Sequence, residues 1–170
     1  RNLMDEYGYT DAESILNEWN YVKGWTDEFQ YTINAVHSIK GAAFTLACIC
    51  EAQQAPIDML MYYDARPTAF NGLFDMYTYR PLKGYYSFYQ FADLYELEDQ
   101  YEAISDDDNV YAVCAKKGDD VAVMLTYYSE NDNDGARYVT INADSSLDGA
   151  KILLTDKDHT MAEYSAAKIK

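Results

Sequence analysis

Apolar residues in the first half of the chain recur with two different spacings, which predict alternating strands and helices. Residues 14–22 predict a strand, and residues 28–54 repeat apolar side chains at helical spacing. Residues 57–63 are a nearly continuous apolar run, which is typical of a strand covered on both faces. Residues 82–97 return to helical spacing. The order strand, helix, strand, helix predicts two parallel strands joined by a right-handed crossover.

The second half of the chain has a different pattern, because strict alternation replaces the helical spacing after about Tyr101. Residues 109–128 predict two strands around the turn KKGDD. Short strands with such spacing indicate an antiparallel sandwich or small sheet. Three further short strands are predicted within residues 137–143, 150–156 and 160–165.

Composition indicates a globular protein and narrows its partners. Hydrophobic residues make up 49% of the chain, which is too many for a disordered one. The 18 tyrosines exceed what a core needs, so many are expected at a surface, an interface or a ligand groove. The net charge of −16 disfavours nucleic acid and anionic membranes as partners, whereas neutral ligands such as sugars are indifferent to it.

Neither the cysteines nor the known sequence motifs indicate a metal site or a particular reaction. Cys48, Cys50 and Cys114 match no zinc spacing, so we expect free, buried thiols, no metal and no cofactor. We find no phosphate-binding glycine loop and no G-x-S-x-G motif. No run of apolar residues is long enough for a transmembrane helix. The first ten residues resemble neither a signal peptide nor a natural start.

Two polar clusters follow the two predicted parallel strands. Glu18, in the run LNEWNY, comes near the end of the first strand, and Tyr63, Asp64 and Arg66 follow the second. Ligands bind beyond the C-terminal ends of strands in parallel α/β folds. We therefore expect the two clusters to meet in one cleft.

A carboxylate among amides and aromatic rings suits the cleavage of sugars. Glu18 would attack or stabilise an oxocarbenium-like centre, and Asn17 and Asn20 would hydrogen-bond to sugar hydroxyls. Rings would pack on the apolar face of the sugar. The aromatic side chains expected to do so are Trp19, Trp25 and Tyr63.

Each of these residues also has a plainer interpretation. A glutamate at a strand end is more often a salt-bridge or capping residue than a catalyst. Trp19 and Trp25 fit core or interface positions as well as they fit a ligand site. The only role of Arg66 could be to pair with Asp64. The two histidines, His37 and His159, fit packing or surface positions better than catalysis.

The order of several motifs resembles the C-terminal part of glycoside hydrolase family 39 and related retaining barrel enzymes of clan A. The run LNEWNY is followed by IKGAAFTLA, DMLMYYDARP, FNGLFDMYTYRPLKGYYSFYQFADLY and the alternating strands. In that family the seventh barrel strand ends in a Glu-Trp-Asn or Glu-Phe-Asn motif. A helix, an eighth strand, a glycine-containing loop and a K-P-x-Y-Y-A-F helix follow. Gly84 stands here where proline is common.

The resemblance implies an α/β part followed by an all-β part. Residues 1–98 would form the seventh and eighth βα units of a (β/α)8 barrel, and residues 99–170 an antiparallel β-sandwich. Glu18 would be the nucleophile, with Asn17, Trp19 and Asn20 around it and Tyr63 and Arg66 contacting the substrate. An Asn-Glu pair also marks the acid/base residue on the fourth strand of these enzymes. Glu18 is likewise preceded by Asn17. However, only one further strand and helix separate Glu18 from the predicted sandwich, so its strand would be the penultimate strand of the barrel, which is the strand that carries the nucleophile.

A retaining mechanism needs a second carboxyl group about 5 Å from the first. The family's acid/base would lie upstream, on strands outside this sequence, and Asp64 is a poor substitute because Arg66 should hold it ionised. A barrel of this kind needs about 250 residues. We therefore expect a fragment, a truncated reading frame or one piece of a split enzyme. It would need the missing barrel portion or another chain.

Three functions are compatible with the sequence. The first is a piece of a β-xylosidase-like glycoside hydrolase that acts on plant-type oligosaccharides and is inactive alone. The second is a non-catalytic carbohydrate-binding or accessory module, with tyrosines and tryptophans as its platform. The third is a small α+β interaction domain with no sugar ligand.

Overall fold

The computed structural model describes residues 1–143 and 149–164 of the chain. Contacts divide the chain into two units, Arg1–Tyr128 (unit 1) and Ser129–Lys170 (unit 2). Helices and strands both contribute, so the fold class is mixed α and β. The sequence predicts a domain boundary at residue 98, and of the strands that follow it the first three belong to unit 1 and the last two to unit 2.

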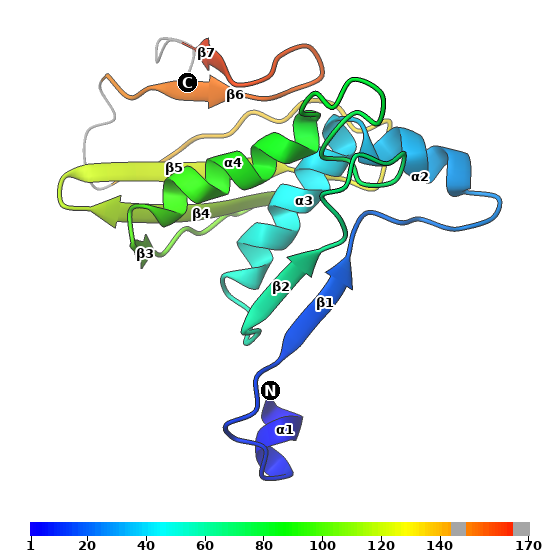
Figure 1. Ribbon diagram of the computed structural model, residues 1–170. Helices are drawn as coiled ribbons and strands as arrows, with labels where there is room; N and C mark the ends of the chain where they lie inside the picture. The colour runs from blue at the N-terminus through cyan, green and yellow to red at the C-terminus, as the bar shows by residue number, and fades with distance from the viewer. Residues whose placement is uncertain (144–148, 165–170) are drawn as a thin grey trace. The chain divides into compact units, whose positions relative to one another are not determined.

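Unit 1 contains four helices and five strands among its residues, in the order shown in Figure 1. Unit 2, over its described residues, contains one pair of strands. The elements are α1 (Asn2–Glu6), β1 (Ile15–Trp19), α2 (Phe29–Val36), α3 (Ile39–Ala52), β2 (Met59–Tyr62), α4 (Lys83–Tyr95), β3 (Asp99–Tyr101), β4 (Val110–Lys117), β5 (Asp120–Tyr127), β6 (Ile152–Leu154) and β7 (Ala162–Tyr164).

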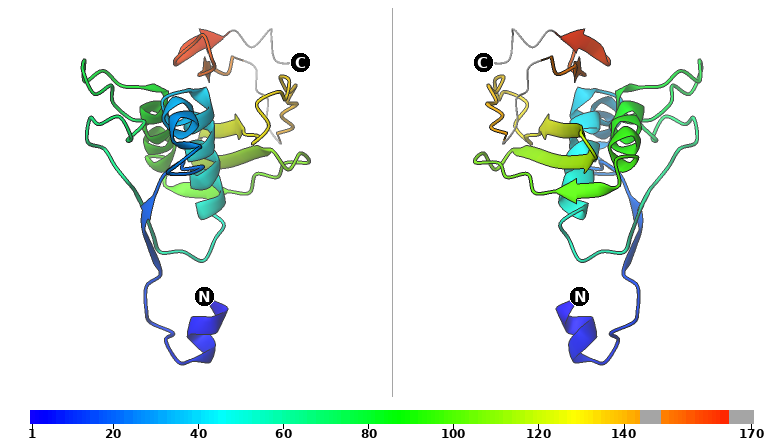
Figure 2. Two further views of the ribbon diagram at one scale, coloured as in Figure 1. Left: turned by 90° about the vertical axis from the view of Figure 1, so that its right-hand side faces the viewer. Right: turned by 90° about the vertical axis from the view of Figure 1, so that its left-hand side faces the viewer.

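The first two strands form a parallel two-stranded sheet, as the sequence predicts. Among the described residues β1 and β2 pair only with each other, so no barrel closes. Figure 1 shows the arrows of both strands pointing away from α1, and the views of Figure 2 show no other sheet beside them. Met59 and Met61 are 41% and 46% exposed, whereas Leu60 and Tyr62 are half-buried. The prediction of a strand covered on both faces is therefore wrong, because the helices cover only one side.

The helix predicted over residues 28–54 is broken into α2 and α3, whose axes differ by 76°. Ser38 adopts an extended conformation and its hydroxyl accepts a hydrogen bond from the N–H of Lys40, which starts α3 as an N-cap. A Cβ on Gly41 would lie 2.6 Å from the carbonyl oxygen of Val36. Glycine thus lets α3 begin against the last turn of α2.

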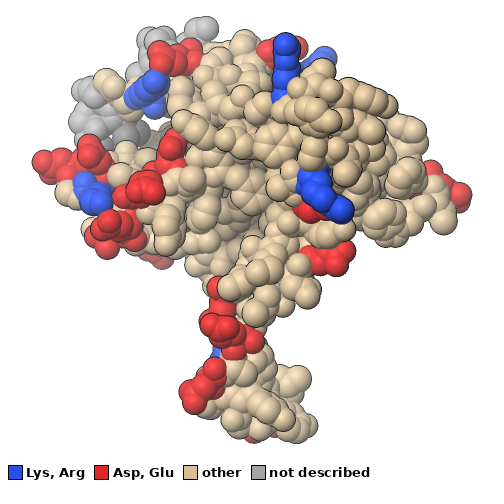
Figure 3. Space-filling model, in the orientation of Figure 1, with Lys and Arg blue, Asp and Glu red and all other residues tan. Residues whose placement is uncertain are grey.

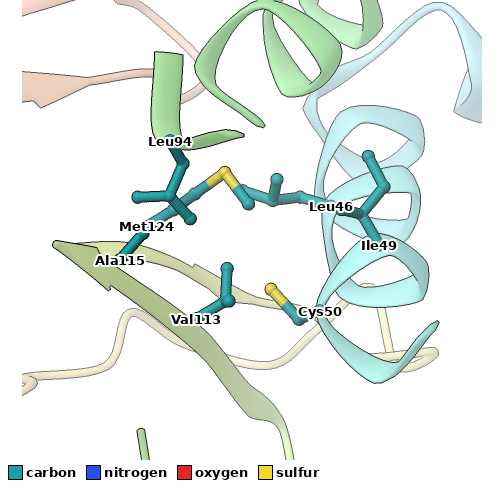
Figure 4. Close-up of a cluster of buried hydrophobic side chains, with 7 residues drawn as sticks. All are labelled: Leu46, Ile49, Cys50, Leu94, Val113, Ala115 and Met124. Atoms are coloured by element: carbon teal, nitrogen blue, oxygen red, sulfur yellow. The ribbon is translucent and has the colours of Figure 1, made fainter. Parts of the chain in front are cut away.

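The main core of unit 1 lies between two helices and a sheet. Figure 4 shows its buried members, which come from α3, α4, β4 and β5: Leu46, Ile49, Cys50, Leu94, Val113, Ala115 and Met124. The buried hydroxyl of Ser87 on α4 donates to the carbonyl of Ala42 on α3 over 2.9 Å. That bond satisfies a polar group inside the helix–helix contact.

The antiparallel strands after residue 98 form two separate small sheets. Strands β3, β4 and β5 pair in that order, and the predicted strands of 109–128 with their KKGDD turn are confirmed. In unit 2, β6 and β7 pair with each other. The strand predicted within 137–143 is wrong, since the chain there has no strand partner and Tyr138 is 99% exposed. The β-sandwich stays a prediction.

No single helix in the described part of the chain has both the length and the apolar content to cross a membrane, although the bent pair α2 and α3 passes both criteria together.

Core packing predicts unequal effects for two neighbouring residues of β5. Met124 is 6% exposed and belongs to the main core, whereas Val123, on the opposite face of the strand, is 42% exposed. Met124→Ala should lower the free energy of unfolding by about 2–5 kcal/mol through lost contacts and a cavity. Val123→Ala should lower it by less than about 1 kcal/mol. Urea unfolding of both variants tests this, and equal losses would contradict the assigned face.

The cysteine thiols are free, and burial makes them poor nucleophiles. Burial raises the pKa of Cys48 to about 11 and that of Cys50 to about 12, and it also raises the pKa of Cys114. Only the thiolate reacts with iodoacetamide. At pH 8 we expect Cys48 and Cys50 to be alkylated about a hundredfold more slowly in the native protein than in urea. Mass spectrometry of quenched samples measures the rates, and rapid native labelling of Cys50 would contradict its burial.

Candidate functional site

The C-terminal ends of β1 and β2 lie side by side at one edge of their sheet. Trp19 pairs with Tyr62, and the N–H of Tyr63 donates to the carbonyl of Trp19 over 2.9 Å. The register shifts just before Trp19, so a bulge carries Asn17 and Glu18. Both polar clusters predicted from the sequence therefore leave the sheet at the same edge.

Asn20 ties three chain segments together at this edge. Its Nδ2 donates to the carbonyl of Tyr63 over 2.7 Å and to the carbonyl of Phe70 over 3.0 Å. Its Oδ1 accepts from the N–H of Tyr21 at 2.7 Å and from the hydroxyl of Tyr62 at 2.8 Å. All of these partners belong to the protein, so the amide of Asn20 serves to position the backbone rather than to bind a ligand.

Tyr62 lies behind the strand ends and keeps its proton. Its hydroxyl contacts Oδ1 of Asn20 and also the carbonyl of Asn71. Burial raises the pKa of Tyr62 well above its ordinary value, and hydrogen bonds with Asn20 and Thr45 offset only part of that rise. Tyr62 is therefore a hydrogen-bond donor and not a base.

Asn71 organises the loop that follows β2. It is 1% exposed, and its Oδ1 accepts from the N–H groups of Leu73 at 2.6 Å and Phe74 at 2.8 Å. Gly72 follows with a φ of 74°, and a Cβ there would lie 2.7 Å from Cγ2 of Val36. The loop that connects β2 and α4 is thus anchored to α2 as well as to β2.

Tyr63, Asp64 and Arg66 form a connected group on the surface. Nη2 of Arg66 lies 2.6 Å from Oδ2 of Asp64 and donates to the hydroxyl of Tyr63 over 2.8 Å. The hydrogen bond to Asp64, and then its charge, raise the pKa of Arg66. The peptide bond between Tyr63 and Asp64 is cis. The pairing of Arg66 with Asp64 that the sequence suggests is confirmed, so the Asp64 carboxylate is already engaged.

Glu18 and Asn17 are both exposed at the strand end. In the described part of the chain, no side chain forms a hydrogen bond or ion pair with the carboxylate of Glu18. The plainer interpretation of Glu18 as a salt-bridge or capping residue therefore has no support. Its carboxylate is exposed to solvent.

Trp19 packs inward rather than forming a wall of the site. Its ring lies edge-on to Tyr62, with centroids 5.1 Å apart, and 6.4 Å from Phe44 on α3. Trp19 is half-buried against α3, whereas Glu18, within the bulge before it, is exposed. The indole nitrogen of Trp19 is buried and has no hydrogen-bond partner among the described residues.

Trp25 joins two phenylalanines in a partly exposed cluster, which we call the aromatic platform (Trp25, Phe29 and Phe70). The ring centroids of Trp25 and Phe70 are 4.7 Å apart, and those of Trp25 and Phe29 are 6.3 Å apart. Trp25 is 65% exposed and Phe29 is 41% exposed. The platform comes from the segments that follow β1 and β2, so it belongs to the same edge of the fold.

One face of the molecule carries few charged side chains over much of its area. In the view of Figure 3, much of unit 1 is uncharged and its acidic residues lie toward the margins.

Among residues 1–143 and 149–164, no group of three or more His, Cys, Asp or Glu side chains is placed to hold a metal ion.

Sequence reasoning missed Tyr62, Asn71, Phe29 and Phe70 as parts of this site. In the sequence, Tyr62 falls in a predicted strand and Phe29 in a predicted helix, so neither stands out as a site residue. The turn signal N-G at Asn71 and Gly72 was visible in the sequence and marks the loop, but it does not name the partner of Asn71.

No family model matches the sequence, and no curated protein or solved structure matches it either.

The hydrogen bonds of Asn20 predict a large effect from its removal. Asn20→Ala would leave the carbonyls of Tyr63 and Phe70 without this donor, and should lower the free energy of unfolding by about 1–3 kcal/mol. Asn17→Ala, in the same strand end but exposed and without such bonds, should change it by less than about 0.5 kcal/mol. Chemical denaturation compares the two, and a neutral Asn20→Ala variant would show that the network contributes nothing.

Proposed function

We propose that the edge formed by β1 and β2 is part of the active site of a retaining glycoside hydrolase, with Glu18 as the nucleophile. The observation that carries the proposal is an exposed, unpaired carboxylate at the C-terminal end of a parallel strand, next to a second strand end rich in polar and aromatic groups. Catalytic groups of α/β barrels come from that end of the strands. Residues 1–98 would supply two βα units of such a barrel, and residues 99–170 a β-sandwich.

Glu18 would carry out the first step of the reaction, the formation of a covalent glycosyl ester. Its carboxylate oxygen attacks the anomeric carbon and forms a glycosyl ester, while the bond to the leaving-group oxygen breaks. A second carboxyl group gives that oxygen a proton, and then takes a proton from the water that hydrolyses the ester. Because Asp64 is ion-paired at 2.6 Å with Arg66, we assign the second carboxyl group to a strand outside this sequence.

The neighbours of Glu18 divide into positioning and contact groups. Asn20 positions the two strand ends, since its amide is fully occupied by protein groups. Asn17 is exposed beside Glu18, where its amide would bind a sugar hydroxyl. Tyr63 and Arg66 would form one wall, with the guanidinium carbon 5.6 Å from the ring centroid.

The alternative function is a non-catalytic carbohydrate-binding module, which the exposed aromatic platform favours. Such a module needs rings that face solvent and has no need of an unpaired carboxylate. The two functions therefore differ in what they require of Glu18.

A mechanism-based reagent separates the two functions. A 2-deoxy-2-fluoroglycoside with a dinitrophenolate leaving group needs no general acid for the first step, because that phenolate leaves without protonation. With native protein, isolated from its source together with any accompanying polypeptide, we expect stoichiometric release of dinitrophenolate. Mass spectrometry should place the sugar on Glu18.

The matched control is Glu13→Gln, since Glu13 is also exposed and precedes the same strand. Glu18→Gln should abolish both the burst and the label, whereas Glu13→Gln should leave both unchanged. A label on another carboxylate, or unchanged turnover in Glu18→Gln, would refute the assignment. Sugar binding without any label would favour the non-catalytic module.

A further inference from the structure

Strand β5 forms the outer edge of its sheet. The strand order of that sheet is β3, β4, β5, so within the described part of the chain β5 pairs with β4 and with no other strand. Every second residue of an edge strand points its backbone N–H and C=O away from the sheet, where another chain can pair with them. The register with β4 is continuous over all eight residues of β5, so no bulge twists this edge away.

The sequence of β5 leaves this edge without the usual protection. Edge strands commonly carry lysine, proline or a bulge, which prevent other strands from pairing with them. Residues 121–127 read VAVMLTY and contain neither a charged residue nor a proline. Val121 and Val123 lie on the face opposite to Met124 and the main core, and they are 50% and 42% exposed. An additional strand would therefore find exposed apolar side chains next to backbone groups that can pair with it.

Acidic residues gather at the end of the sheet where β5 begins. Residues 96–120 contain nine Asp and Glu residues against two Lys residues, so this short stretch carries −7 of the net charge of −16. Asp119 and Asp120 are both exposed at the start of β5. Figure 3 shows acidic side chains over the part of the molecule where Figure 1 places β3 and the turn between β4 and β5. One of the two lysines, Lys117, is already ion-paired with Glu98 over 2.7 Å.

This charge decides which kind of strand can pair with β5. A second copy of the chain would bring the same acidic turn and the same net charge of −16, so pairing between two copies is repelled. An extended segment with Lys or Arg at one end would instead be attracted to Asp119 and Asp120. Addition of a strand to a sheet edge is a known mode of peptide recognition, in which backbone bonds give affinity and alternate side chains give specificity.

We propose that the outer edge of β5 binds an extended, basic segment of a partner protein as an additional strand of the sheet. The segment pairs antiparallel to β5, as the other strands of this sheet pair with their neighbours. Its basic C-terminal residues then lie next to Asp119 and Asp120, and its alternate apolar side chains lie beside Val121 and Val123. The interaction does not depend on the proposed glycosidase activity, because β5 and Glu18 belong to different sheets.

Fluorescence anisotropy of the full chain with the labelled peptide TVTVTVKKR tests this interaction. The peptide should bind at low salt and more weakly at high salt, because salt screens the attraction between the charges. The peptide TVTVTVEEE should bind at least about a hundredfold more weakly, since its charge has the wrong sign. The peptide TVTPTVKKR keeps the charge but loses a backbone N–H in the middle of the strand, and it should bind at least about tenfold more weakly.

Variants of the protein locate the binding edge. The double variant Asp119→Asn and Asp120→Asn should weaken binding of TVTVTVKKR by about tenfold. The matched control is Asp11→Asn with Glu13→Gln, which changes the net charge equally at exposed residues before β1 and should have no effect. Val123→Lys should also weaken binding, since it adds a like charge beside the edge. Hydrogen exchange should slow in residues 120–127 when the peptide binds and stay unchanged in β1.

Several results would overturn the proposal. They are an absence of binding by TVTVTVKKR, equal binding by the acidic or the proline peptide, equal effects of the two double variants, and slowed exchange outside β5 alone. Dimerisation of the protein at low salt, seen by sedimentation and abolished by Val123→Lys, would also overturn it, because a second copy would then occupy the edge.

Discussion

The candidate site depends on the four hydrogen bonds of Asn20. β1 ends at Trp19 and β2 ends at Tyr62, and two short parallel strands give few backbone bonds to hold their ends in register. Asn20 adds side-chain bonds across the ends, from one amide to Tyr63, to Phe70 and to the hydroxyl of Tyr62. Because Tyr62 in turn contacts Asn71, the same amide is linked to the buried residue that shapes the next loop. The spacing between Glu18, the group around Arg66 and the aromatic platform therefore follows from one polar network.

The main core lies elsewhere and makes this arrangement stable. Helices α3 and α4 pack on β4 and β5, and the buried cluster of Figure 4 contains no residue of β1 or β2. Tyr62 reaches that core through Phe88, which packs against it, whereas Trp19 contacts Phe44, which packs against a second buried cluster of Tyr21, Ala35 and Val36. Substitutions on the exposed face of β1 should thus leave the folded state nearly unchanged, which is what a catalytic position requires.

Local pattern was sufficient for some of the fold and insufficient for the rest. The parallel strands, the helix at α4 and the hairpin of β4 and β5 follow from spacing alone. The break between α2 and α3 does not, because the close approach of Gly41 to Val36 is a tertiary contact. The alternation over 137–143 predicted a strand, but a strand also needs a partner to pair with. The polar network of the site joins residues 42, 43 and 50 positions apart, and no periodicity encodes such bonds. The place of Glu18 near the end of β1, by contrast, follows from the sequence pattern.

The proposed function would explain why β1 and β2 expose apolar side chains and unpaired sheet edges. Ile15, Leu16, Met59 and Met61 are between 41% and 49% exposed, although parallel sheets are normally buried on both faces. Both outer edges of the sheet also have unpaired backbone groups, which attract further strands. A barrel completed by other strands would cover the methionines, satisfy the edges and enclose Glu18 in a site of low dielectric. An isolated binding module would gain nothing from such apolar edges, so the exposed face of β1 and β2 favours the catalytic proposal over the accessory one.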